Sequence, residues 1–290
     1  MTSLKSLAFA AACAVICLAP GTALAKSSRG AEKTNPSYYL ALGDSLAAGA
    51  QPNAVGTTVP TNKGYADDVY AAERKHNKHL KLEKLGCLGE TTTSMLKGGK
   101  FCHYKGTQLA DAVKFIKAHK VSLITLDIGA NNVDGCAKYT GSQLVSCVGS
   151  GLTTIKADVP KIVKALRKAA GAKVRIAGMT YYDPFLAYYL DPAPRNSLAP
   201  VSVGLSQQLN GDLSSAFNGQ KLKIADVATA FGTYVPFTTT APLAGHGTVP
   251  LAVAKICQLT WMCAAAPRGP NIHGTVSGYQ LMARVFEQAL

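Results

Sequence analysis

The sequence contains no apolar run long enough to cross a bilayer, no internal repeat, and no Pro-rich or Ser-rich linker. A transmembrane helix needs about 20 consecutive apolar residues, and the apolar run at residues 7–19 is shorter. This run follows Lys5 and leads to Ala23-Leu24-Ala25, which is the layout of a cleavable secretory signal peptide. We therefore expect a secreted, extracellular protein with a signal peptide at residues 1–25, a flexible tail at 26–36 and a single domain at 37–290.

Three motifs of well-known enzyme classes are also absent. The sequence has no G-x-S-x-G elbow of the α/β-hydrolases, no H-E-x-x-H zinc helix and no G-x-x-x-x-G-K-[ST] phosphate loop. Their absence argues against these classes. We expect neither a cofactor nor a metal ion.

Acidic residues are scarce, with 16 Asp and Glu against 30 Lys and Arg, which gives a formal net charge of +14. Removal of Lys5 with the signal peptide would lower this charge by one, to +13. The densest basic stretch, 74–84, is not interleaved with aromatic residues, so it does not resemble a nucleic-acid platform. We expect no nucleic-acid partner and a monomer. Peripheral attraction to anionic surfaces and a merely solvated basic face both remain open.

Cysteines are few and even in number once the signal peptide is removed. Cys13 and Cys17 lie within that peptide, and six cysteines remain. In an exported protein an even number favours disulfides over a metal site, although free buried thiols remain the alternative. The six fall into three couples that are close in sequence, and each couple would close one loop: Cys87–Cys102, Cys136–Cys147 and Cys257–Cys263.

Short apolar runs alternate with longer stretches of helical period. This alternation predicts an α/β fold, a three-layer α/β/α sandwich with a mainly parallel sheet. The predicted strands are rich in Val, Ile, Leu or Tyr and lie at 38–42, 123–128, 174–179 and 222–227, with a weaker fifth strand around 79–84. The predicted helices lie at 108–120, 152–170, 202–217 and 277–288.

Polar turns that begin with glycine follow two of these strands. The first is Gly43-Asp44-Ser45-Leu46 and the second is Gly129-Ala130-Asn131-Asn132. Loops at the carboxyl ends of parallel strands converge on one crevice. A serine at a helix N-terminus beside such a crevice suits a nucleophile, because developing negative charge is favoured there. Ser45 as a simple helix N-cap is an equally good interpretation from these residues alone.

A serine nucleophile needs a base, which is normally histidine. His273 lies just before the last predicted helix, in the segment Pro270-Asn271-Ile272-His273-Gly274. The other five histidines lie in the basic stretch, at a helix end, beside a cysteine or in a glycine loop: His76, His79, His119, His103 and His246. A lone loop histidine is more often a surface residue, so its position alone does not decide its role.

Four segments in order resemble the sequence blocks of the GDSL or SGNH hydrolase family. They are GDSLAAG at 43–49, LGCLGETTTSML at 85–96, DIGANN at 127–132 and NIHGTVSGY at 271–279. Together they spread over nearly the whole chain after the signal peptide. The cysteine couples and the segment Trp261-Met262-Cys263 further resemble the secreted actinobacterial esterase and lipase branch.

The resemblance implies a flavodoxin-like sheet and a serine esterase or lipase. It implies that Ser45 is the nucleophile and His273 the general base. It also implies that Gly89 and Asn131 form the oxyanion hole together with the N–H of Ser45. From the residues alone, Gly89 and Asn131 are also compatible with ordinary turns.

Two positions depart from the family pattern. Asn132 stands where the third block usually ends in aspartate, and Pro270 and Asn271 stand where an aspartate usually precedes the histidine. We therefore expect a Ser–His dyad in which the main-chain carbonyl of Asn271 orients His273. The alternative is that a distant carboxylate, Asp183 or Asp226, completes a triad. An unperturbed imidazole titrates near about 6.5, so we expect the rate to fall between about pH 6 and 7.

The substrate is expected to be a small-molecule or lipid carboxylic ester, and the sequence does not select among acylglycerols, phospholipids, acetylated sugars and thioesters. Apolar residues in predicted loops suit an acyl pocket or plain core packing equally well: Tyr181, Tyr182, Phe185, Tyr188, Tyr189, Trp261 and Met262. The alternative to an enzyme is a secreted binding protein that has the same fold and no catalytic activity.

Overall fold

A computed structural model of the chain describes residues 36–99, 102 and 104–290. Its centre is a parallel five-stranded sheet with the order β4-β1-β5-β6-β7. The strands are β1 (Ser37–Gly43), β4 (Lys81–Lys84), β5 (Lys120–Asp127), β6 (Arg175–Met179) and β7 (Lys223–Ala225). This order reverses between β1 and β5, as in flavodoxin-like sheets, and ligands bind at such a reversal.

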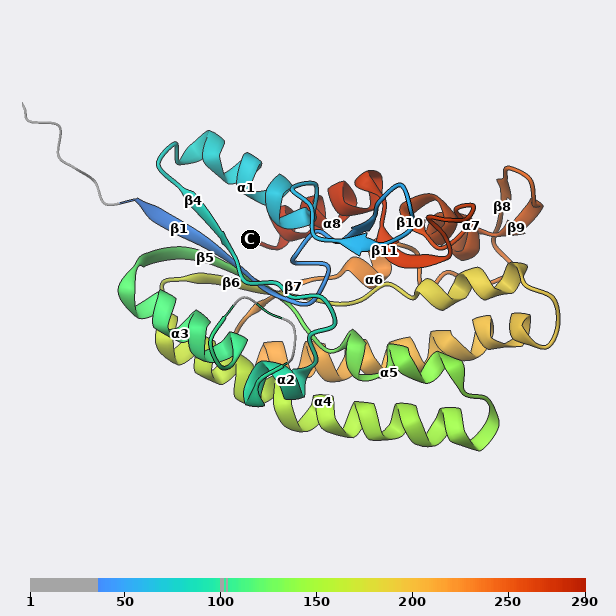
Figure 1. The fold of residues 1–290 in the computed structure, drawn as a ribbon, viewed down its shortest axis with the longest axis horizontal. Helices are drawn as coiled ribbons and strands as arrows, with labels where there is room; N and C mark the ends of the chain where they lie inside the picture. The colour runs from blue at the N-terminus through green and yellow to red at the C-terminus, as the bar shows by residue number, and fades with distance from the viewer. Residues whose placement is uncertain (1–35, 100–101, 103) are drawn as a thin grey trace, which may run out of the picture. The chain divides into compact units, whose positions relative to one another are not determined.

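Helices cover both faces of the sheet (Figure 1). On one face α1 (Tyr65–His76) packs against α8 (Val276–Ala289). On the other face α4 (Gly141–Ala170) packs against both α3 (Gln108–Ala118) and α5 (Leu198–Gly219). The predicted three-layer α/β/α sandwich is therefore confirmed.

Shorter elements connect this frame. The helices are α2 (Thr92–Lys97), α6 (Val227–Ala230) and α7 (Leu251–Leu259). The short antiparallel pairs are β2 (Gln51–Pro52) with β3 (Thr58–Val59), β8 (Thr240–Leu243) with β9 (Gly247–Pro250), and β10 (Thr260–Trp261) with β11 (Asn271–Gly274). The 3-10 turns are η1 (Ala130–Asn132), η2 (Asp134–Lys138), η3 (Pro184–Leu190) and η4 (Arg195–Ser197).

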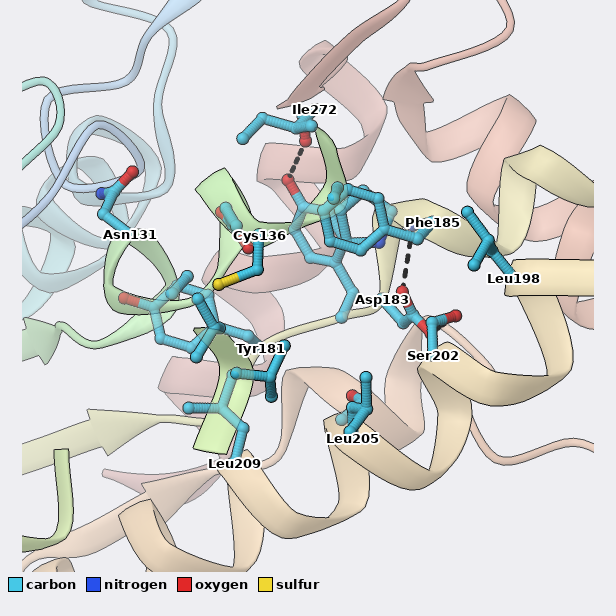
Figure 2. Close-up of a pocket in the computed structure, with 18 of the residues that line it drawn as sticks. Asn131, Cys136, Tyr181, Asp183, Phe185, Leu198, Ser202, Leu205, Leu209 and Ile272 are labelled. Carbon is cyan, nitrogen blue, oxygen red and sulfur yellow. Dashed lines mark hydrogen bonds between the residues drawn. The ribbon is translucent and has the colours of Figure 1, made fainter. Parts of the chain in front are cut away.

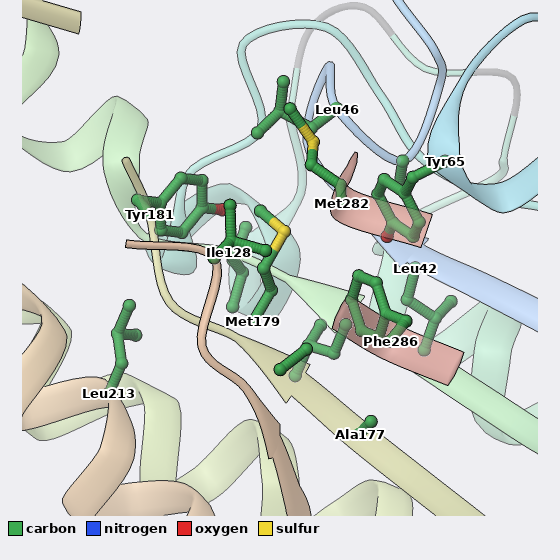
Figure 3. Close-up of a cluster of buried hydrophobic side chains, with 14 of the residues drawn as sticks. Leu42, Leu46, Tyr65, Ile128, Ala177, Met179, Tyr181, Leu213, Met282 and Phe286 are labelled. Atoms are coloured by element: carbon green, nitrogen blue, oxygen red, sulfur yellow. The ribbon is translucent and has the colours of Figure 1, made fainter. Parts of the chain in front are cut away.

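The core lies between the sheet and the helices on each face. On one face the rings of Tyr65 from α1 and Phe286 from α8 stack with their centroids 4.7 Å apart, and both side chains are fully buried (Figure 3). Leu42 from β1 and Met282 from α8 lie in the same cluster. These contacts hold α8, and with it the segment that precedes it, against the sheet.

Helix α4 is longer than its predicted range of 152–170 because it begins at Gly141. Glycine and proline disfavour helix interiors, and Gly149, Gly151 and Pro160 interrupt the helical pattern. Gly151 serves close packing instead, since a Cβ at this position would overlap the carbonyl oxygen of Asn132. The helix therefore reaches past the sheet and passes directly beside η1.

The cysteines of the described region lie in the three expected couples. The Cα atoms are 5.8 Å apart for Cys87 and Cys102, 5.7 Å for Cys136 and Cys147, and 4.9 Å for Cys257 and Cys263, which are disulfide separations. The described residues, which begin at residue 36, belong to one compact unit. The expected signal peptide, and the tail up to residue 35, lie outside the described residues. In the described ranges, no helix combines the length and apolarity that a membrane span requires.

Candidate active site

The turn after β1 places Ser45 at the carboxyl edge of the sheet. Gly43 ends the strand with φ of +136°, and a Cβ there would overlap the carbonyl oxygen of Asp127 on β5. Only glycine allows this approach. The chain can therefore turn sharply, and Ser45 is buried with 7% exposure at the reversal point of the strand order.

The buried carboxyl groups of Asp127 and Asp44 accept hydrogen bonds from the backbone of this turn. Asp127 Oδ2 accepts the backbone N–H groups of Asp44 and Ala47, each at 3.2 Å, and its Oδ1 accepts the phenol of Tyr65. The carboxyl of Asp44 accepts the N–H of Leu46 at 2.9 Å. Burial raises the pKa of both carboxyls, and the charge of Asp44 raises the pKa of Asp127 further. These hydrogen bonds fix the backbone on both sides of Ser45.

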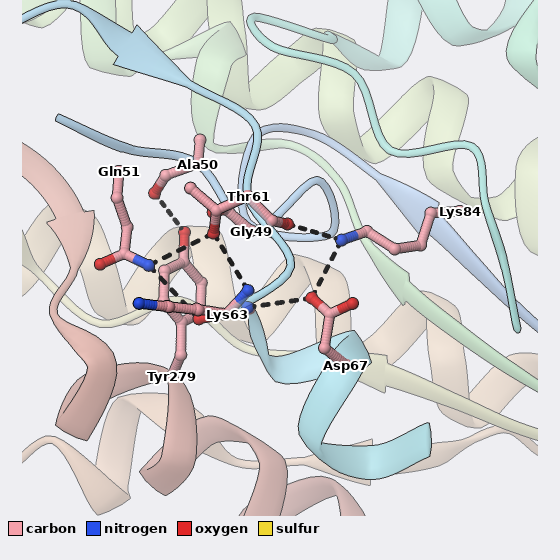
Figure 4. A network of polar contacts seen from close by, with 9 residues as sticks. Gly49, Ala50, Gln51, Thr61, Lys63, Asp67, Lys84 and Tyr279 are labelled. Atoms are coloured by element: carbon pink, nitrogen blue, oxygen red, sulfur yellow. Dashed lines mark hydrogen bonds and ion pairs between the residues drawn. The ribbon is translucent and has the colours of Figure 1, made fainter. Parts of the chain in front are cut away.

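A second polar network secures the chain that follows Ser45 (Figure 4). The phenol of Tyr279 on α8 donates to the carbonyl oxygen of Ala50 at 2.7 Å, and the hydroxyl of Thr61 donates to that of Gly49 at 2.6 Å. Lys84 Nζ reaches both the carbonyl oxygen of Thr61 and a carboxylate oxygen of Asp67. The loop is therefore tied to α8, α1 and β4.

His273 lies within hydrogen-bond distance of Ser45. Its Nε2 is 2.8 Å from Ser45 Oγ, and the histidine side chain is buried with 8% exposure. The histidine belongs to the short strand β11, which pairs with β10, rather than to an open loop. Burial lowers the pKa of His273 to about 4, so the imidazole is neutral at pH 7 and able to accept a proton.

The prediction that the main-chain carbonyl of Asn271 orients His273 is wrong. The side-chain Oδ1 of Asn271, not its carbonyl oxygen, lies 2.7 Å from His273 Nδ1. The same Oδ1 accepts the backbone N–H of His273, while Asn271 Nδ2 donates to Thr58 Oγ1 at 2.8 Å. These bonds orient the amide so that Nδ1 of the imidazole keeps its proton and Nε2 faces the serine.

The two carboxylates considered as alternative partners lie in other networks. Asp183 accepts the hydroxyl of Ser202 at 2.6 Å and the N–H of Phe185 at 3.0 Å. Asp226 caps α6 and accepts the hydroxyl of Thr180 at 2.9 Å. Neither is a hydrogen-bond partner of His273 in the described part of the chain.

Asn131, one of the expected oxyanion donors, lines the same cavity as Ser45. Among the described residues, the backbone N–H groups of Ser45 and Gly89 have no hydrogen-bond partner. Asn131 Nδ2 donates one hydrogen to the carbonyl oxygen of Glu90 at 3.0 Å, and its second hydrogen remains available. This hydrogen bond therefore joins the segment after β4, which carries Gly89, to the turn after β5, which carries Asn131. The family resemblance assigns both residues to the oxyanion hole.

Glu90 and Gln108 support this corner, and the sequence analysis did not identify them. The amide of Gln108 bonds both the N–H and the carbonyl oxygen of Gly43, at 2.7 and 2.8 Å. Its Nε2 also donates to the carboxylate of Glu90 at 3.2 Å, and that carboxylate accepts Ser94 and Tyr104 as well. The sequence gives no signal for this role, because the burial of Gln108 is visible only in the structure, where a buried polar group requires partners.

Comparison with known proteins was made for both sequence and structure. No family model and no curated protein sequence matches the chain. The structure is similar to an extracellular lipase from Streptomyces rimosus, with a TM-score of 0.57, and to phospholipase A1 from Streptomyces albidoflavus NA297, with a TM-score of 0.58. Each is 16% identical, and the match covers 88% of this chain and 100% of the other.

A GDSL-like lipase from Parabacteroides merdae matches with a TM-score of 0.52 and 15% identity, over 88% of this chain and 95% of its own. This chain has the GDSL-like lipase fold. At such low identity the similarity establishes the fold, and any activity has to be argued from the residues of the site.

In this GDSL-like fold, a mostly apolar cavity of about 110 Å³, partly open to solvent, lies beside Ser45 and His273. It runs between the N-terminal halves of α4 and α5 and is closed on a third side by η3. Figure 2 shows α5 side chains, including Leu205 and Leu209, facing Tyr181 and Phe185. Its lining from α4 and α5 is apolar apart from serines: Leu144, Val148, Leu152, Leu198, Val201, Ser202, Leu205, Ser206 and Leu209.

Four of the seven residues proposed for an acyl pocket line this cavity: Tyr181, Tyr182, Phe185 and Tyr188. Tyr189, Trp261 and Met262 do not line it. Two of the four also hold the site together. The phenol of Tyr181 donates to Asp44 at 2.6 Å, and that of Tyr182 donates to the carbonyl oxygen of Ile272 at 2.6 Å.

Besides Asp44, two further carboxyl groups line this cavity, those of Asp134 and Asp183. Burial raises the pKa of Asp183 to about 6, despite hydrogen bonds that lower it. Burial, followed by the charges of Asp44 and Asp183, raises the pKa of Asp134 to about 8. Asp134 is therefore protonated and neutral at pH 7, which keeps its part of the cavity uncharged.

Proposed function

We propose that the protein is a secreted serine esterase or lipase that cleaves carboxylic esters through an acyl-enzyme on Ser45. The observation that carries the proposal is the 2.8 Å contact between Ser45 Oγ and His273 Nε2, with Asn271 Oδ1 on the opposite nitrogen of the ring. Nucleophile, base and orienting group therefore lie in the order that acyl transfer requires.

In the first half of the reaction, His273 Nε2 takes the hydroxyl proton as Ser45 Oγ attacks the ester carbonyl carbon. The carbonyl oxygen becomes an oxyanion, which accepts hydrogen bonds from the N–H groups of Ser45 and Gly89 and from Asn131 Nδ2. Removing one such donor typically costs about 3–4 kcal/mol of transition-state stabilisation. The intermediate then expels the alcohol, which receives the proton from His273.

In the second half, the oxygen of a water molecule attacks the carbonyl carbon of the acyl-serine ester, and the bond from that carbon to Ser45 Oγ then breaks. His273 takes a proton from the water and returns a proton to Ser45 Oγ as the carboxylic acid leaves. The same oxyanion donors stabilise this second intermediate. No other group in the cycle has to change its charge, because Asn271 accepts a hydrogen bond from Nδ1 without being ionised.

The cavity favours an ester whose acyl part is an apolar chain. Its walls between α4 and α5 bury such a chain, at about 0.8 kcal/mol per CH₂ group. The mostly apolar lining gives no support to the carbohydrate acetylesterase alternative. A non-catalytic binding role would not require a neutral histidine placed 2.8 Å from Ser45 Oγ.

Labelling with an organophosphate tests the proposal. The wild type should be labelled on Ser45 and should hydrolyse a p-nitrophenyl ester. Ser45→Ala should lose both properties, with kcat reduced at least about a thousandfold and thermal unfolding unchanged. Ser150→Ala, on the exposed surface of α4, is the matched control. Turnover by Ser45→Ala within about tenfold of wild type would exclude Ser45 as the nucleophile.

A further inference from the structure

Several exposed apolar side chains lie on or next to the elements that line the cavity. The described residues include six large apolar side chains that are strongly exposed: Val55, Tyr139, Val145, Tyr189, Val201 and Val276. Four of the six adjoin the cavity. Val201 lines it directly, and Tyr139, Val145 and Tyr189 lie within two residues of the lining residues Ala137, Leu144 and Tyr188.

These four residues lie in or next to four elements that contribute lining residues to the cavity. Tyr139 follows η2, Val145 lies in the first turns of α4, Tyr189 lies in η3 and Val201 in the first turn of α5. Helices α4 and α5 pack against each other and begin at the same end (Figure 1), and residues of their N-terminal halves line the cavity. We call Tyr139, Val145, Tyr189 and Val201 the rim.

Charge is sparse around the rim although the chain as a whole carries +14. No charged residue lies between Lys138 and Lys156. On the η3 side, Asp191 is paired with Arg195 at 3.3 Å, and the Arg195 guanidinium lies 3.9 Å from the centre of the Tyr188 ring. The rim is thus an apolar surface with exposed Lys138 at its edge and no unpaired carboxylate on its flanks.

We propose that the rim docks the protein on the surface of an anionic lipid aggregate, so that the cavity opens into the lipid phase. Exposed apolar residues that surround a pocket mark an interaction site. The cavity that opens through this rim is itself apolar, which suits acyl chains, and acyl esters of long chains reside in aggregates rather than free in water. Exposed Lys138 at the edge of the rim adds attraction to anionic lipid.

Vesicle binding tests docking separately from hydrolysis. The protein used is the Ser45→Ala variant, which should not digest the vesicles if the proposed function holds. Vesicles contain phosphatidylglycerol mixed with phosphatidylcholine, or phosphatidylcholine alone, and binding is measured by co-sedimentation. The variant should bind the anionic vesicles more tightly than the neutral ones, and high salt should weaken this binding.

The chain offers a closely matched pair of double substitutions. Val145 and Tyr189 on the rim are 69% and 42% exposed, whereas Val55 and Val276 away from the cavity lining are 75% and 42% exposed. In the Ser45→Ala background, V145S/Y189S should weaken binding to anionic vesicles about tenfold, and V55S/V276S should leave it within about twofold. Equal losses in the two pairs, or no loss in the first, would overturn the proposal.

Kinetics with Ser45 intact separate this proposal from the proposed function, on which its kinetic part depends. V145S/Y189S should hydrolyse a soluble short-chain ester like wild type and lose rate only on vesicle-bound substrate. Failure of the wild type to cleave any ester would overturn the function and leave the binding result standing. A rim-dependent dimer, seen by light scattering and unable to bind vesicles, would show that a second copy covers the rim and would overturn the proposal.

Discussion

Asn271 Oδ1 lies 2.7 Å from His273 Nδ1, and the amide that supplies it is fixed by Thr58. The acceptor is a neutral side chain where a serine triad usually has a carboxylate. It holds the tautomer of the imidazole, and it stabilises the imidazolium of the transition state less than a carboxylate would. The side chain of Asn271 thereby becomes part of the proposed machinery.

Substitution of Asn271 tests this role. Asn271→Ala should lower kcat/KM about a hundredfold, equivalent to about 2.7 kcal/mol, because the imidazole loses its acceptor. Asn271→Asp should keep activity within about tenfold and raise the pKa of His273, because a carboxylate favours the charged ring. Steady-state kinetics across pH would show both effects. If Asn271→Ala kept wild-type kcat/KM, the main-chain carbonyl would regain the orienting role.

The acid limit of the activity follows from the burial of His273. Its pKa is lowered from about 6.5 to about 4, so the neutral base persists as pH falls through 6. We expect kcat/KM to fall near pH 4, not between 6 and 7 as the unperturbed value suggests. Initial rates on a soluble ester from pH 3 to 8, with the fold followed by circular dichroism, would measure this. A midpoint of 6 to 7 would contradict the burial of the imidazole.

The same shift affects stability, and its sign can be worked out. Between pH 6.5 and 4 the unfolded chain protonates His273 while the folded chain does not, so the unfolded state binds more protons. The free energy of unfolding should therefore decrease as pH falls through this range. His273→Gln removes the group and should reduce this part of the pH dependence in thermal melts.

Asp134 provides a prediction at the alkaline side. Its pKa of about 8 means that a negative charge appears in the apolar cavity as pH rises through 8. For an ester with an apolar acyl chain, kcat/KM should then decrease, because a buried charge disfavours the chain. Asp134→Asn should remove this alkaline decrease and leave the acid limit unchanged. An identical alkaline decrease in both proteins would show that another group causes it.

The sheet and the position of Ser45 follow from the sequence for a simple physical reason, whereas the choice of His273 came from the family resemblance. Apolar runs such as 38–42 and 123–128 become buried parallel strands, and polar turns can follow them only at one edge. The structure gives β1 as Ser37–Gly43 and β5 as Lys120–Asp127. The extension of α4 to Gly141 was missed because glycine normally disfavours helices, and here close packing against Asn132 decides.

The sequence could not show which atom of Asn271 accepts the hydrogen bond from His273 Nδ1. A main-chain carbonyl and a side-chain amide of the same Asn271 are equally near in sequence, and the choice depends on Thr58, more than 200 residues away. The cavity could not be predicted either, because its walls come from α4 and α5, which are separated in sequence and meet only in the folded chain. Tyr181 and Tyr182 illustrate the limit, because both line the cavity and also donate hydrogen bonds that no local pattern reveals.

These two tyrosines connect the cavity to the two halves of the reacting pair. Tyr181 donates to Asp44, beside the nucleophile, and Tyr182 donates to the carbonyl oxygen of Ile272, beside the base. Removal of either hydroxyl leaves an acceptor unpaired. The cost should be larger for Tyr181→Phe, because the carboxyl of Asp44 is more deeply buried than the partly buried carbonyl of Ile272.

We therefore predict a graded series of three Tyr→Phe variants. Tyr181→Phe should lower the free energy of unfolding by about 2–3 kcal/mol and Tyr182→Phe by about 1 kcal/mol. Tyr189→Phe, whose side chain is exposed, should change it little. Because Tyr182 positions the strand that carries His273, Tyr182→Phe should also lower kcat with little effect on KM for a soluble ester. Denaturant unfolding and steady-state kinetics measure the series. Tyr189→Phe as the most destabilised variant, or Tyr182→Phe with unchanged kcat, would contradict this, because neither result fits a base held in place through Ile272.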